Sequence, residues 1–279
     1  MTTFAALTAA AADRFRMAGL TEPRREAIRL LGDLSGASPG EVVLRGEEPV
    51  SAALALRFTD AVGRRAAGEP IAYVSGVAGF RHLTVSVDRR VLIPRPETEG
   101  LVDLVRALVP SGRVLDVGTG SGCIALSLAL EGAYDVTATD ASLDALAVAA
   151  ENARRLDLPV RLLAGDLVAP VAGELFSAVV SNPPYLTRAE YLALGPGVRD
   201  WEPEPALWSG VDGLDATRRL VADVPPVLEA GGWLMLEVDC SRAAGVAALA
   251  WRSGWSEVAV HQDLFGRDRY LVARRGMTQ

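Results

Sequence analysis

RVLDVGTGSGCIALSLA, residues Arg113–Ala129, sets the architecture of the C-terminal part of this 279-residue chain. An apolar run ends at Asp116, three glycines follow at alternate positions, and a second apolar run begins after Gly122. Glycines let the backbone turn tightly and approach a ligand closely. A strand, a glycine loop and a helix in this order predict the ligand-binding end of a parallel α/β sheet.

The glycine spacing indicates the kind of ligand. The pattern over Gly118–Gly122 is G-x-G-x-G, shorter than the G-x-G-x-x-G fingerprint of dinucleotide sites. With Asp116 just before it, this tighter loop suits a ligand without a pyrophosphate. S-adenosylmethionine is such a ligand, since its amino acid end needs hydrogen bonds and its sulfonium is positive. We expect it to be bound, and S-adenosylhomocysteine released, by Asp116, Gly118, Thr119, Gly120, Ser121 and Gly122.

Strands alternate with helices from Gly112 onward, and helical stretches such as Leu143–Leu156 and Leu214–Leu228 lie between most of the strands. This alternation predicts an α/β fold, a Rossmann-like, doubly wound and mostly parallel sheet. The last two strands are joined by too short a segment for a helix, so they should pair antiparallel at the sheet edge. The predicted strands are Arg113–Val117, Asp135–Thr139, Val160–Leu163, Ala178–Val180, Trp233–Val238, Val258–Val260 and Tyr270–Val272.

Two more carboxylates follow strands of this sheet. Asp140 lies 22 positions after Gly118, where a carboxylate can accept both ribose hydroxyls. It could instead cap the next helix, although Ser142 can do that alone. Asp166 follows the third strand, where it can accept from an adenine amino group with Leu167 beside the ring; an exposed loop aspartate would look the same. Ligands of open α/β sheets bind at these C-terminal strand ends.

The fourth strand runs into SNPPYLT, Ser181–Thr187. Adjacent prolines cannot donate to a sheet ladder, so the strand must stop there. The same residues suit a reaction at an NH2 group: the Asn182 side-chain oxygen accepts one N–H, the Pro183 carbonyl accepts the other, and Tyr185 offers a flat face. Because an amide nitrogen is a poor nucleophile, positioning would supply much of the catalysis. We expect Asn182, Pro183 and Tyr185 to be catalytic, Asn182 to face the cofactor as well, and Pro184 to contact the substrate.

The chain before this sheet has a different character. Residues 1–70 contain helical periodicities with caps at Ser38 and Ser51, which predict a small helical bundle. Residues 71–95 are rich in β-branched and aromatic residues and predict a hairpin linker. Residues 96–279 form the predicted sheet domain, which begins with Pro96 in the first turn of a helix.

Composition narrows the class of protein. The formal net charge of −7 weighs against tight binding of duplex nucleic acid. Cys123 and Cys240 are far apart without metal-ligand spacing, so we expect no metal and a reduced, cytoplasmic setting. The sequence contains neither a signal-peptide pattern nor an apolar run of membrane-spanning length. We expect a cytoplasmic enzyme that acts as a monomer, without a membrane or a stable nucleic-acid partner.

Several segments together resemble the glutamine-N5 methyltransferases that modify bacterial peptide chain release factors, and the resemblance covers nearly the whole chain. The G-x-G-x-G and Asn-Pro-Pro-Tyr pieces are shared with many amino-group methyltransferases, whereas IPRPETE joined to GEPIAY is far more specific. The matching segments are GEPIAYVSG (Gly68–Gly76), VLIPRPETE (Val91–Glu99), LDVGTGSG (Leu115–Gly122), SNPPY (Ser181–Tyr185), EPEPAL (Glu202–Leu207), DGLD (Asp212–Asp215) and GRDRYLVAR (Gly266–Arg274).

This resemblance implies a helical N-terminal domain that docks a protein substrate, a hairpin linker and a catalytic domain that uses S-adenosylmethionine. It implies that the substrate is the glutamine of a release factor Gly-Gly-Gln loop. Asn182 and Pro183 would hold the glutamine amide, Tyr185 would pack against it, and Phe80 would close the pocket. The pocket wall would include Arg95, Thr98 and Glu99, residues that could equally clamp the entry to a helix.

The sequence departs from the family pattern at two places. Arg81 and His82 stand where members of the family often have an aromatic residue and a glycine. After Glu237, many members have a glycine two residues on and a glutamine further along, whereas this sequence reads EVDCSRAA, with Asp239 and Arg242. Neither place carries the predicted chemistry. Three alternatives stay open: methylation of a nucleic-acid base, methylation of another protein or of a small-molecule amide, and a binding module without catalysis. The intact Asn182 and glycine loop argue against the last.

Overall fold

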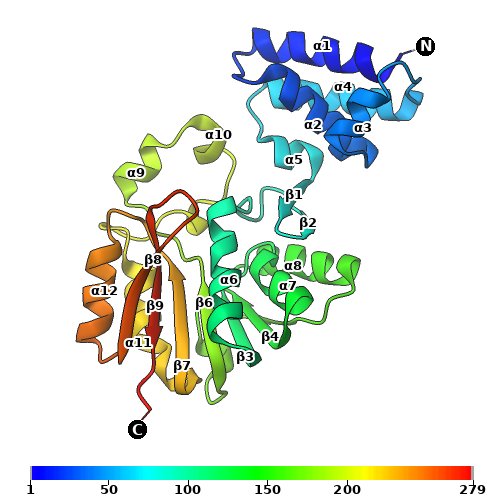
Figure 1. Ribbon diagram of the computed structural model, residues 1–279. Helices are drawn as coiled ribbons and strands as arrows, with labels where there is room; N and C mark the ends of the chain where they lie inside the picture. Colours follow the sequence, from blue (N-terminus) through cyan, green and yellow to red (C-terminus); the bar gives the residue numbers. More distant parts are fainter. Residues whose placement is uncertain (1, 278–279) are drawn as a thin grey trace. The chain divides into compact units, whose positions relative to one another are not determined.

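The computed structural model describes residues 2–277, which form two compact units (Figure 1). One unit contains the chain up to Val77 together with Gly195–Trp201, and the other contains Ala78–Leu194 and the chain from Glu202 onward. Each unit has its own buried apolar core. The predicted combination of an N-terminal helical bundle and a sheet domain is confirmed.

The first unit is helical, and its core includes Phe15, Leu30 and Phe58, all essentially inaccessible to solvent. Ser38 caps its helix in the predicted capping box with Glu41. Its helices are α1 (Phe4–Met17), α2 (Pro23–Ser35), α3 (Pro39–Leu44), α4 (Ala52–Ala66), α5 (Ile71–Ser75) and α10 (Pro196–Arg199).

The hairpin is shorter than predicted. It consists of β1 (Val77–Phe80) and β2 (Leu83–Ser86), whereas Ile71–Ser75 forms helix α5, so the expectation of strand from residue 71 was wrong there. Pro70 starts α5 by accepting two backbone N–H groups at its carbonyl, and Gly76 ends the helix in a left-handed conformation. Local capping therefore overrode the β-branched composition of this segment.

The second unit is built on a sheet of order β5-β4-β3-β6-β7-β9-β8, in which β9 pairs antiparallel with both β7 and β8 and the other described pairs are parallel. All predicted strands are confirmed, including the antiparallel last pair. The strands are β3 (Ser111–Val117), β4 (Ala133–Asp140), β5 (Arg161–Ala164), β6 (Phe176–Ser181), β7 (Leu228–Glu237), β8 (Glu257–Gln262) and β9 (Asp268–Arg274).

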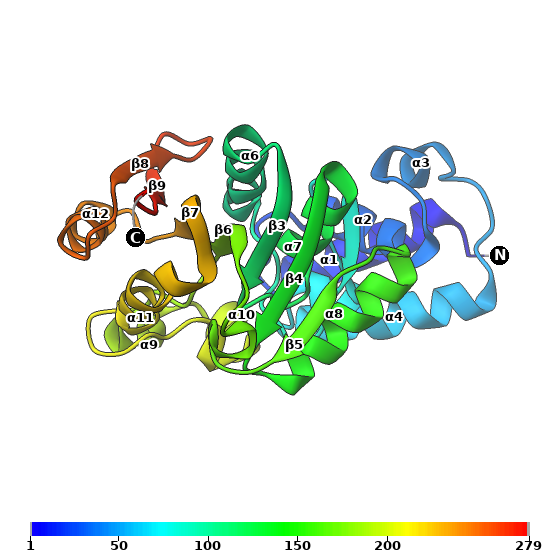
Figure 2. The ribbon, with the colours of Figure 1, turned by 90° about the horizontal axis from the view of Figure 1, so that it is seen from below.

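Helices cover both faces of this sheet, with α6 and α11 on opposite sides (Figure 2). The predicted helix Leu214–Leu228 ends early, because Pro225 and Pro226 lack the N–H groups that a helix needs, and residues from Leu228 onward enter β7. The helices are α6 (Glu99–Leu108), α7 (Cys123–Glu131), α8 (Leu143–Leu156), α9 (Arg188–Ala193), α11 (Asp215–Asp223) and α12 (Ala243–Arg252).

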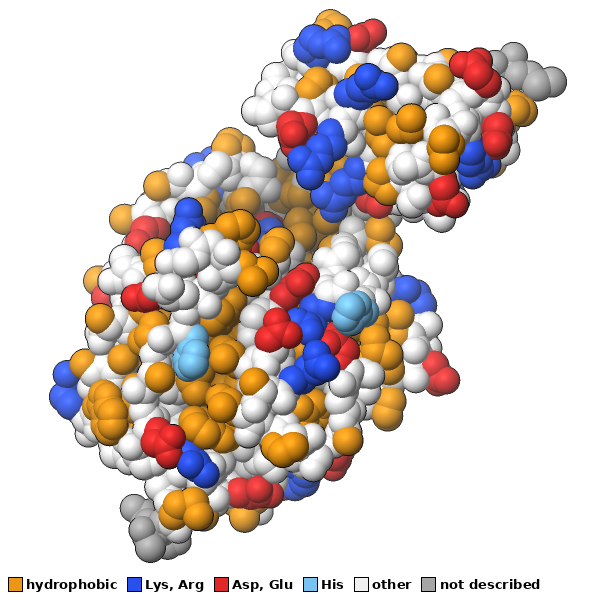
Figure 3. All heavy atoms as spheres, in the orientation of Figure 1, with side chains coloured by type: hydrophobic (Ala, Val, Ile, Leu, Met, Phe, Trp, Pro, Cys, Tyr) orange, Lys and Arg blue, Asp and Glu red, His pale blue; other side chains and the backbone are white. Residues whose placement is uncertain are grey.

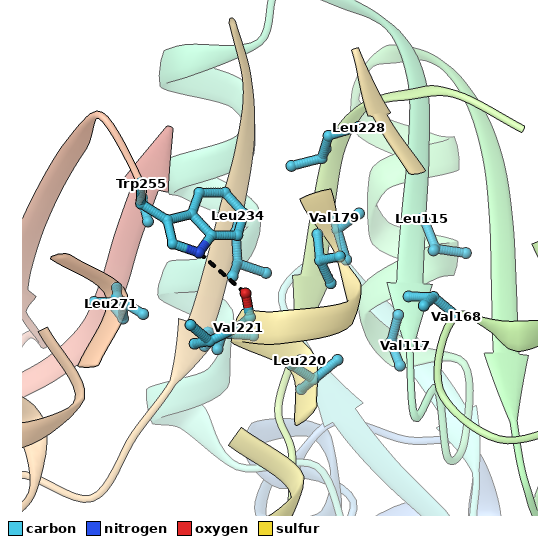
Figure 4. Packing of buried hydrophobic residues seen from close by; sticks show 14 of the residues in the cluster. Leu115, Val117, Val168, Val179, Leu220, Val221, Leu228, Leu234, Trp255 and Leu271 are labelled. Carbon is cyan, nitrogen blue, oxygen red and sulfur yellow. Dashed lines mark hydrogen bonds between the residues drawn. The ribbon is translucent and has the colours of Figure 1, made fainter. Parts of the chain in front are cut away.

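One core cluster of this unit lies between the central strands and helices that include α11 (Figure 4). Leu115, Val179 and Leu234 come from three neighbouring strands and are completely buried together with Leu220 of α11. The Trp255 indole donates to a carbonyl of α11 at 3.1 Å, which satisfies the one polar atom that this ring buries. This packing makes the sheet a rigid base for the loops at its carboxyl edge.

The strand register brings the ends of β3, β6 and β7 level with one another. Val117 lies beside Ser181, and Ser181 lies beside Leu236. Asp140 ends β4 on the other side of β3. Residues that follow these positions therefore share one edge of the sheet, which is the edge where open α/β sheets bind ligands.

Candidate functional site

The glycine loop between β3 and α7 has the backbone that its sequence predicts. Gly118, Gly120 and Gly122 have φ angles of 72°, 55° and 83°, in the left-handed region that favours glycine. A Cβ added at Gly118 or Gly120 would meet no heavy atom within 4 Å, so this part of the loop borders open space. A Cβ at Gly122 would come within 3.3 Å of Ala149, so this glycine allows close packing of the loop on α8. The loop thus leaves room for a ligand.

Asp140 holds this loop in place. One of its carboxylate oxygens accepts from the Gly120 N–H and the other from the Ser142 N–H, both at 2.9 Å. The Ser142 hydroxyl caps α8 by accepting from the Ala145 N–H, so the helix does not need Asp140 as its cap. A carboxylate has about four acceptor sites, and two of these remain for the ribose hydroxyls that we predict.

Asp116 is completely buried beneath the loop. One carboxylate oxygen accepts from the Thr119 hydroxyl at 2.7 Å and the Ala125 N–H at 3.2 Å, while the other oxygen, Oδ1, has no hydrogen-bond partner. Burial raises the pKa of Asp116 to about 7. A buried carboxylate with one unpartnered oxygen beside an open glycine loop fits a positively charged ligand such as S-adenosylmethionine.

Asp166 and Leu167 lie after β5, as expected from the sequence. Leu167 has a φ of 48°, and its carbonyl accepts from the Thr139 hydroxyl at 2.9 Å. Asp166 is exposed and forms a two-bond ion pair with Arg219 of α11, with a shortest distance of 2.6 Å. No sequence pattern predicts Arg219 as a partner, and it occupies the carboxylate that we expect to accept from the adenine amino group.

The Asn-Pro-Pro-Tyr segment begins where β6 ends. The Ser181 hydroxyl donates to the Val117 carbonyl at 2.7 Å and ties this end of β6 to β3. Asn182 donates its side-chain N–H to the Thr98 hydroxyl at 3.1 Å, so its amide oxygen, Oδ1, is the end that this bond leaves unused. Pro183 is buried, and Pro184 and Tyr185 are half-buried.

A buried carboxylate lies behind this segment. Glu237, the last residue of β7, accepts from the Thr98 hydroxyl at 2.7 Å and from the Tyr185 hydroxyl at 3.4 Å. Burial raises the pKa values of both Glu237 and Tyr185. Sequence reasoning placed Thr98 on the pocket wall but assigned Glu237 no role. The signal was there, since Glu237 is an acidic residue at a strand end, like Asp140.

Arg95 lies in an ion pair that joins two of the family-like segments. Its guanidinium lies 2.5 Å from Glu202, whose other oxygen accepts from the Ile93 N–H at 3.0 Å. Arg95 itself stays partly exposed, and its predicted contact with substrate remains a prediction. Glu99 accepts from the backbone N–H of Arg81 at 2.9 Å and thereby supports the hairpin turn.

The hairpin turn explains the departure at Arg81. This residue has a φ of 51°, and its buried guanidinium makes two bonds of 2.7 Å to Glu131 and an ion pair of 2.8 Å with Asp103. It therefore fastens the turn to α6 and α7. Phe80, just before it, is fully buried, and its role in closing the pocket stays a prediction.

The second departure from the family pattern, at Asp239 and Arg242, also forms ion pairs that connect neighbouring segments. The Arg242 guanidinium lies 2.6 Å from Glu190 of α9 and 3.2 Å from Asp239, and it donates to the Asp212 carbonyl at 3.0 Å. Glu190 in turn completes the capping box of α9 with Thr187. Arg242 thus holds α9 and the loop before α11 against the carboxyl end of β7.

Three further findings bear on the kind of protein and the kind of site. In residues 2–277, no group of three or more His, Cys, Asp and Glu residues is arranged to hold a metal ion. Acidic and basic side chains are interspersed over the face shown in Figure 3. Over the same described range, no helix has the length and apolar character needed to cross a membrane.

Comparison with known proteins places these features in a family. Residues 6–76 match the family described as PrmC N-terminal domain, and residues 97–193 match the methyltransferase small domain. The chain is 42% identical over 269 residues to the release factor glutamine methyltransferase of Cereibacter sphaeroides, which covers 95% of this chain and 96% of that protein. It is 41% identical over 266 residues to the protein of the same name from Deinococcus radiodurans, with 94% and 95% covered.

Solved structures share the fold at low sequence identity. A methyltransferase from Pyrococcus furiosus superposes with a TM-score of 0.54 at 19% identity, over 70% of this chain and 90% of that one. The hMettl16 catalytic domain, solved in complex with the MAT2A 3'UTR hairpin 6, superposes with a TM-score of 0.57 at 16% identity, over 82% and 83% of the two chains. The sheet and its helices are therefore those of a methyltransferase fold.

Proposed function

This chain belongs to the release factor glutamine methyltransferases, and from that premise we propose that it methylates the side-chain nitrogen of the glutamine in a release factor Gly-Gly-Gln loop. The observation that carries the proposal to specific atoms is the direction of the Asn182 amide. Its N–H is bonded to Thr98, so its oxygen is left to accept from an incoming NH2 group.

S-adenosylmethionine, when bound, supplies a methyl group on a positively charged sulfur. Transfer to the glutamine nitrogen would form a carbon–nitrogen bond as the methyl group leaves the sulfur as a neutral thioether, and the nitrogen would give up one proton to water. The nitrogen becomes acidic only as the methyl group arrives, so no side chain has to remove a proton first. Positioning of the amide is therefore the main task of the protein.

Asn182 and Pro183 would perform this positioning. The Asn182 amide oxygen accepts one N–H of the substrate amide and the Pro183 carbonyl accepts the other, which fixes the plane and direction of the NH2 group. Pro183 and Pro184 make the backbone rigid at this point. Tyr185, with its hydroxyl tied to Glu237, presents its ring to the same group.

The cofactor would occupy the space in front of the glycine loop. Asp116 and Asp140 would supply negative charge and ribose acceptors, and the backbone of Gly118–Gly122 would approach the amino acid end. For Asp166 to accept from the adenine amino group, it would have to share its carboxylate with Arg219. The proposed cofactor site thus uses the ends of β3, β4 and β5.

The N-terminal helical unit would dock the release factor. Support comes from its match to the PrmC N-terminal domain and from its exposed apolar side chains Met17, Leu44 and Leu56. The net charge of −7 supports a protein substrate over a stable nucleic-acid partner. We further propose that the chain acts as a monomer in the cytoplasm.

Transfer of a labelled methyl group tests this function. The purified chain is incubated with labelled S-adenosylmethionine and a release factor, and in parallel with the same factor carrying glutamate or alanine for the loop glutamine. We expect label only on the unaltered factor. Equal labelling of the unaltered and altered factors would refute the proposal. In a third incubation with DNA in place of the factor, label on the DNA would favour the base-modifying alternative.

A further inference from the structure

We propose that Glu237 is a positioning residue that, through the Thr98 hydroxyl, fixes which end of the Asn182 amide faces the substrate. The inference rests on the proposed function, because it concerns how the acceptor for the substrate amide is kept in the right direction. Glu237 contacts neither cofactor nor substrate in this scheme and acts only through Thr98 and Tyr185.

The problem arises from the symmetry of an asparagine side chain. The oxygen and the NH2 group of Asn182 are nearly equal in size, and a half-turn about the terminal bond exchanges them. With the NH2 group outward, a donor would meet the donors of the substrate amide, and the bracket formed with the Pro183 carbonyl would fail. Some other group must therefore fix the direction of Asn182.

Glu237 solves this problem through a chain of donors and acceptors. An ionised carboxylate only accepts hydrogen bonds. The Thr98 hydroxyl therefore donates its one proton to Glu237, at 2.7 Å. The Thr98 oxygen can then only accept from Asn182, at 3.1 Å. Asn182 must therefore turn its NH2 group toward Thr98 and its oxygen away from Thr98, toward the position proposed for the substrate.

Burial limits the alternatives to this series of hydrogen bonds. Thr98 and Glu237 are 2% and 1% exposed, so water has little access to replace either partner. The other oxygen of Glu237 accepts from the Tyr185 hydroxyl, so one carboxylate supports two members of the Asn-Pro-Pro-Tyr segment. The three interacting segments are far apart in sequence, and only the fold brings them together at this edge of the sheet.

The chain depends on the charge of Glu237. A protonated Glu237 could donate to Thr98, which would then donate to Asn182 and favour the reversed amide. Burial raises the pKa of Glu237, while the Thr98 bond and the positive charge of Arg269 oppose this rise. The other groups that face it are Tyr185, Tyr270 and Glu97. Turnover should therefore fall as the pH falls through a value above the usual one for glutamate, 4.5.

A pair of variants at Thr98 tests the inference. Thr98→Val keeps the shape and removes the hydroxyl, and we expect kcat to fall by about 100-fold while the Kd of S-adenosylmethionine changes by less than about three-fold. Thr98→Ser keeps the hydroxyl and should retain kcat within about three-fold of the unaltered chain. An unchanged kcat in Thr98→Val, or an equal loss in both variants, would overturn the inference.

Glu237→Gln provides a second variant, and it carries the test if Thr98→Val does not fold. Its amide can donate to Thr98, so we expect kcat to fall by at least about 10-fold and the acidic limb of the kcat–pH profile to disappear. An acidic limb that persists unchanged in Glu237→Gln would assign the titration to another group and contradict the inference.

A measurement without turnover separates this inference from the proposed function. The side-chain NH2 signals of Asn182, identified by their absence in Asn182→Ala, are followed by nitrogen-15 NMR. We expect them to shift with the titration of Glu237 and to exchange with water at least about 10-fold faster in Thr98→Val. If the unaltered chain labels no release factor, the proposed function fails and these signals still decide the positioning. If it labels the factor and the signals ignore both residues, only the positioning fails.

Discussion

Asp116 and Glu237 are both buried carboxylates at the carboxyl ends of strands, on β3 and β7, yet they are satisfied differently. One oxygen of Asp116 has no hydrogen-bond partner, whereas Glu237 accepts a hydroxyl proton on each oxygen. Burial raises the pKa of both groups. The first carboxylate keeps one unpartnered oxygen beneath the glycine loop, whereas both oxygens of the second accept hydrogen bonds from protein hydroxyls.

This difference separates two ways in which a buried charge can serve a site. A buried carboxylate with an unpartnered oxygen destabilises the fold, and a positively charged ligand would relieve that cost. We therefore expect Asp116 to strengthen the binding of a cation. Glu237 accepts a hydrogen bond from a protein hydroxyl on each oxygen and is 1% exposed, so we propose that it serves the site by ordering its neighbours Thr98 and Tyr185. Loss of Asp116 should then affect binding, and loss of the Glu237 chain should affect turnover.

The largest effect on turnover is expected at Asn182, the last residue of the hydrogen-bond series from Glu237 through Thr98. Asn182→Ala removes the substrate acceptor and should lower kcat by about 1,000-fold, while the Kd of S-adenosylmethionine rises by less than about five-fold. Steady-state kinetics and isothermal titration calorimetry measure the two quantities. Asp157→Asn, a change at an exposed helix end, is the control and should alter neither. A variant with unchanged kcat would remove Asn182 from the catalytic role.

Asp116→Asn should produce the next largest effect, which we expect on cofactor affinity and not on turnover. We expect the Kd of S-adenosylmethionine to rise by about 10- to 100-fold, because a neutral amide cannot balance the sulfonium charge. The same variant should be more stable without ligand. Calorimetric titration at pH 8 measures the affinity, and a Kd within two-fold of the unaltered chain would contradict the assignment.

The stability change has a defined pH dependence. The pKa of Asp116 is raised from 3.8 to about 7 in the folded chain, so folding is disfavoured by ionisation of this group as the pH rises through that window. Asp116→Asn escapes this cost and should raise the free energy of unfolding by about 1–3 kcal/mol above pH 7, with no gain near pH 4. Denaturant unfolding at both pH values checks the prediction, and an equal gain at both would contradict it.

Asp140 should show an intermediate effect, since its carboxylate both supports the loop and faces the proposed ribose. Asp140→Asn retains one acceptor oxygen and should raise the Kd of S-adenosylmethionine by about 10-fold. Ser142→Ala is the matched control, because it removes only the α8 cap: it should cost about 1 kcal/mol in stability and leave the Kd within two-fold. Equal Kd values in the two variants would remove the Asp140 carboxylate from the proposed cofactor site.

Tyr185→Phe should give the smallest effect. It removes a hydroxyl bond of 3.4 Å to Glu237 but keeps the ring, so kcat should fall by about two- to five-fold. Tyr191→Phe on α9 changes the same kind of ring away from the substrate bracket and serves as the comparison in the kinetic assay. A loss of 100-fold in Tyr185→Phe would show that the hydroxyl, rather than the ring, takes part in the reaction.

Much of the fold could be predicted from the sequence because the deciding signals are local. A few neighbouring residues are enough to predict the glycine loop, the apolar strands and the strand end at the prolines after Ser181. The errors arose where local signals conflicted. Composition suggested strand at Ile71–Ser75 although Pro70 and Gly76 frame a helix there, and helical periodicity suggested that α11 continues although Pro225 and Pro226 end it.

The sequence predicts the residues that we propose face the ligands, but not the groups behind them. Asp116 lies near the end of an apolar strand and Asn182 directly follows one, so both positions point to the edge of the sheet where ligands bind. Glu237 ends a strand, as Asp140 does, and this position marks it as a site candidate, but its role could not be predicted because its partner Thr98 is 139 positions away and hydrogen bonds over such separations leave no periodic pattern. The ion pair between Asp166 and Arg219 was hidden for the same reason.

A crystal structure of this chain with S-adenosylhomocysteine and a release factor measures the central contacts directly. We predict that the amide of the Gly-Gly-Gln glutamine donates one N–H to the Asn182 side-chain oxygen and the other to the Pro183 carbonyl, each at about 2.9 Å. The Asn182 nitrogen should still donate to Thr98. A glutamine amide bound elsewhere, or one that faces the Asn182 nitrogen, would contradict the bracket on which the proposed reaction depends.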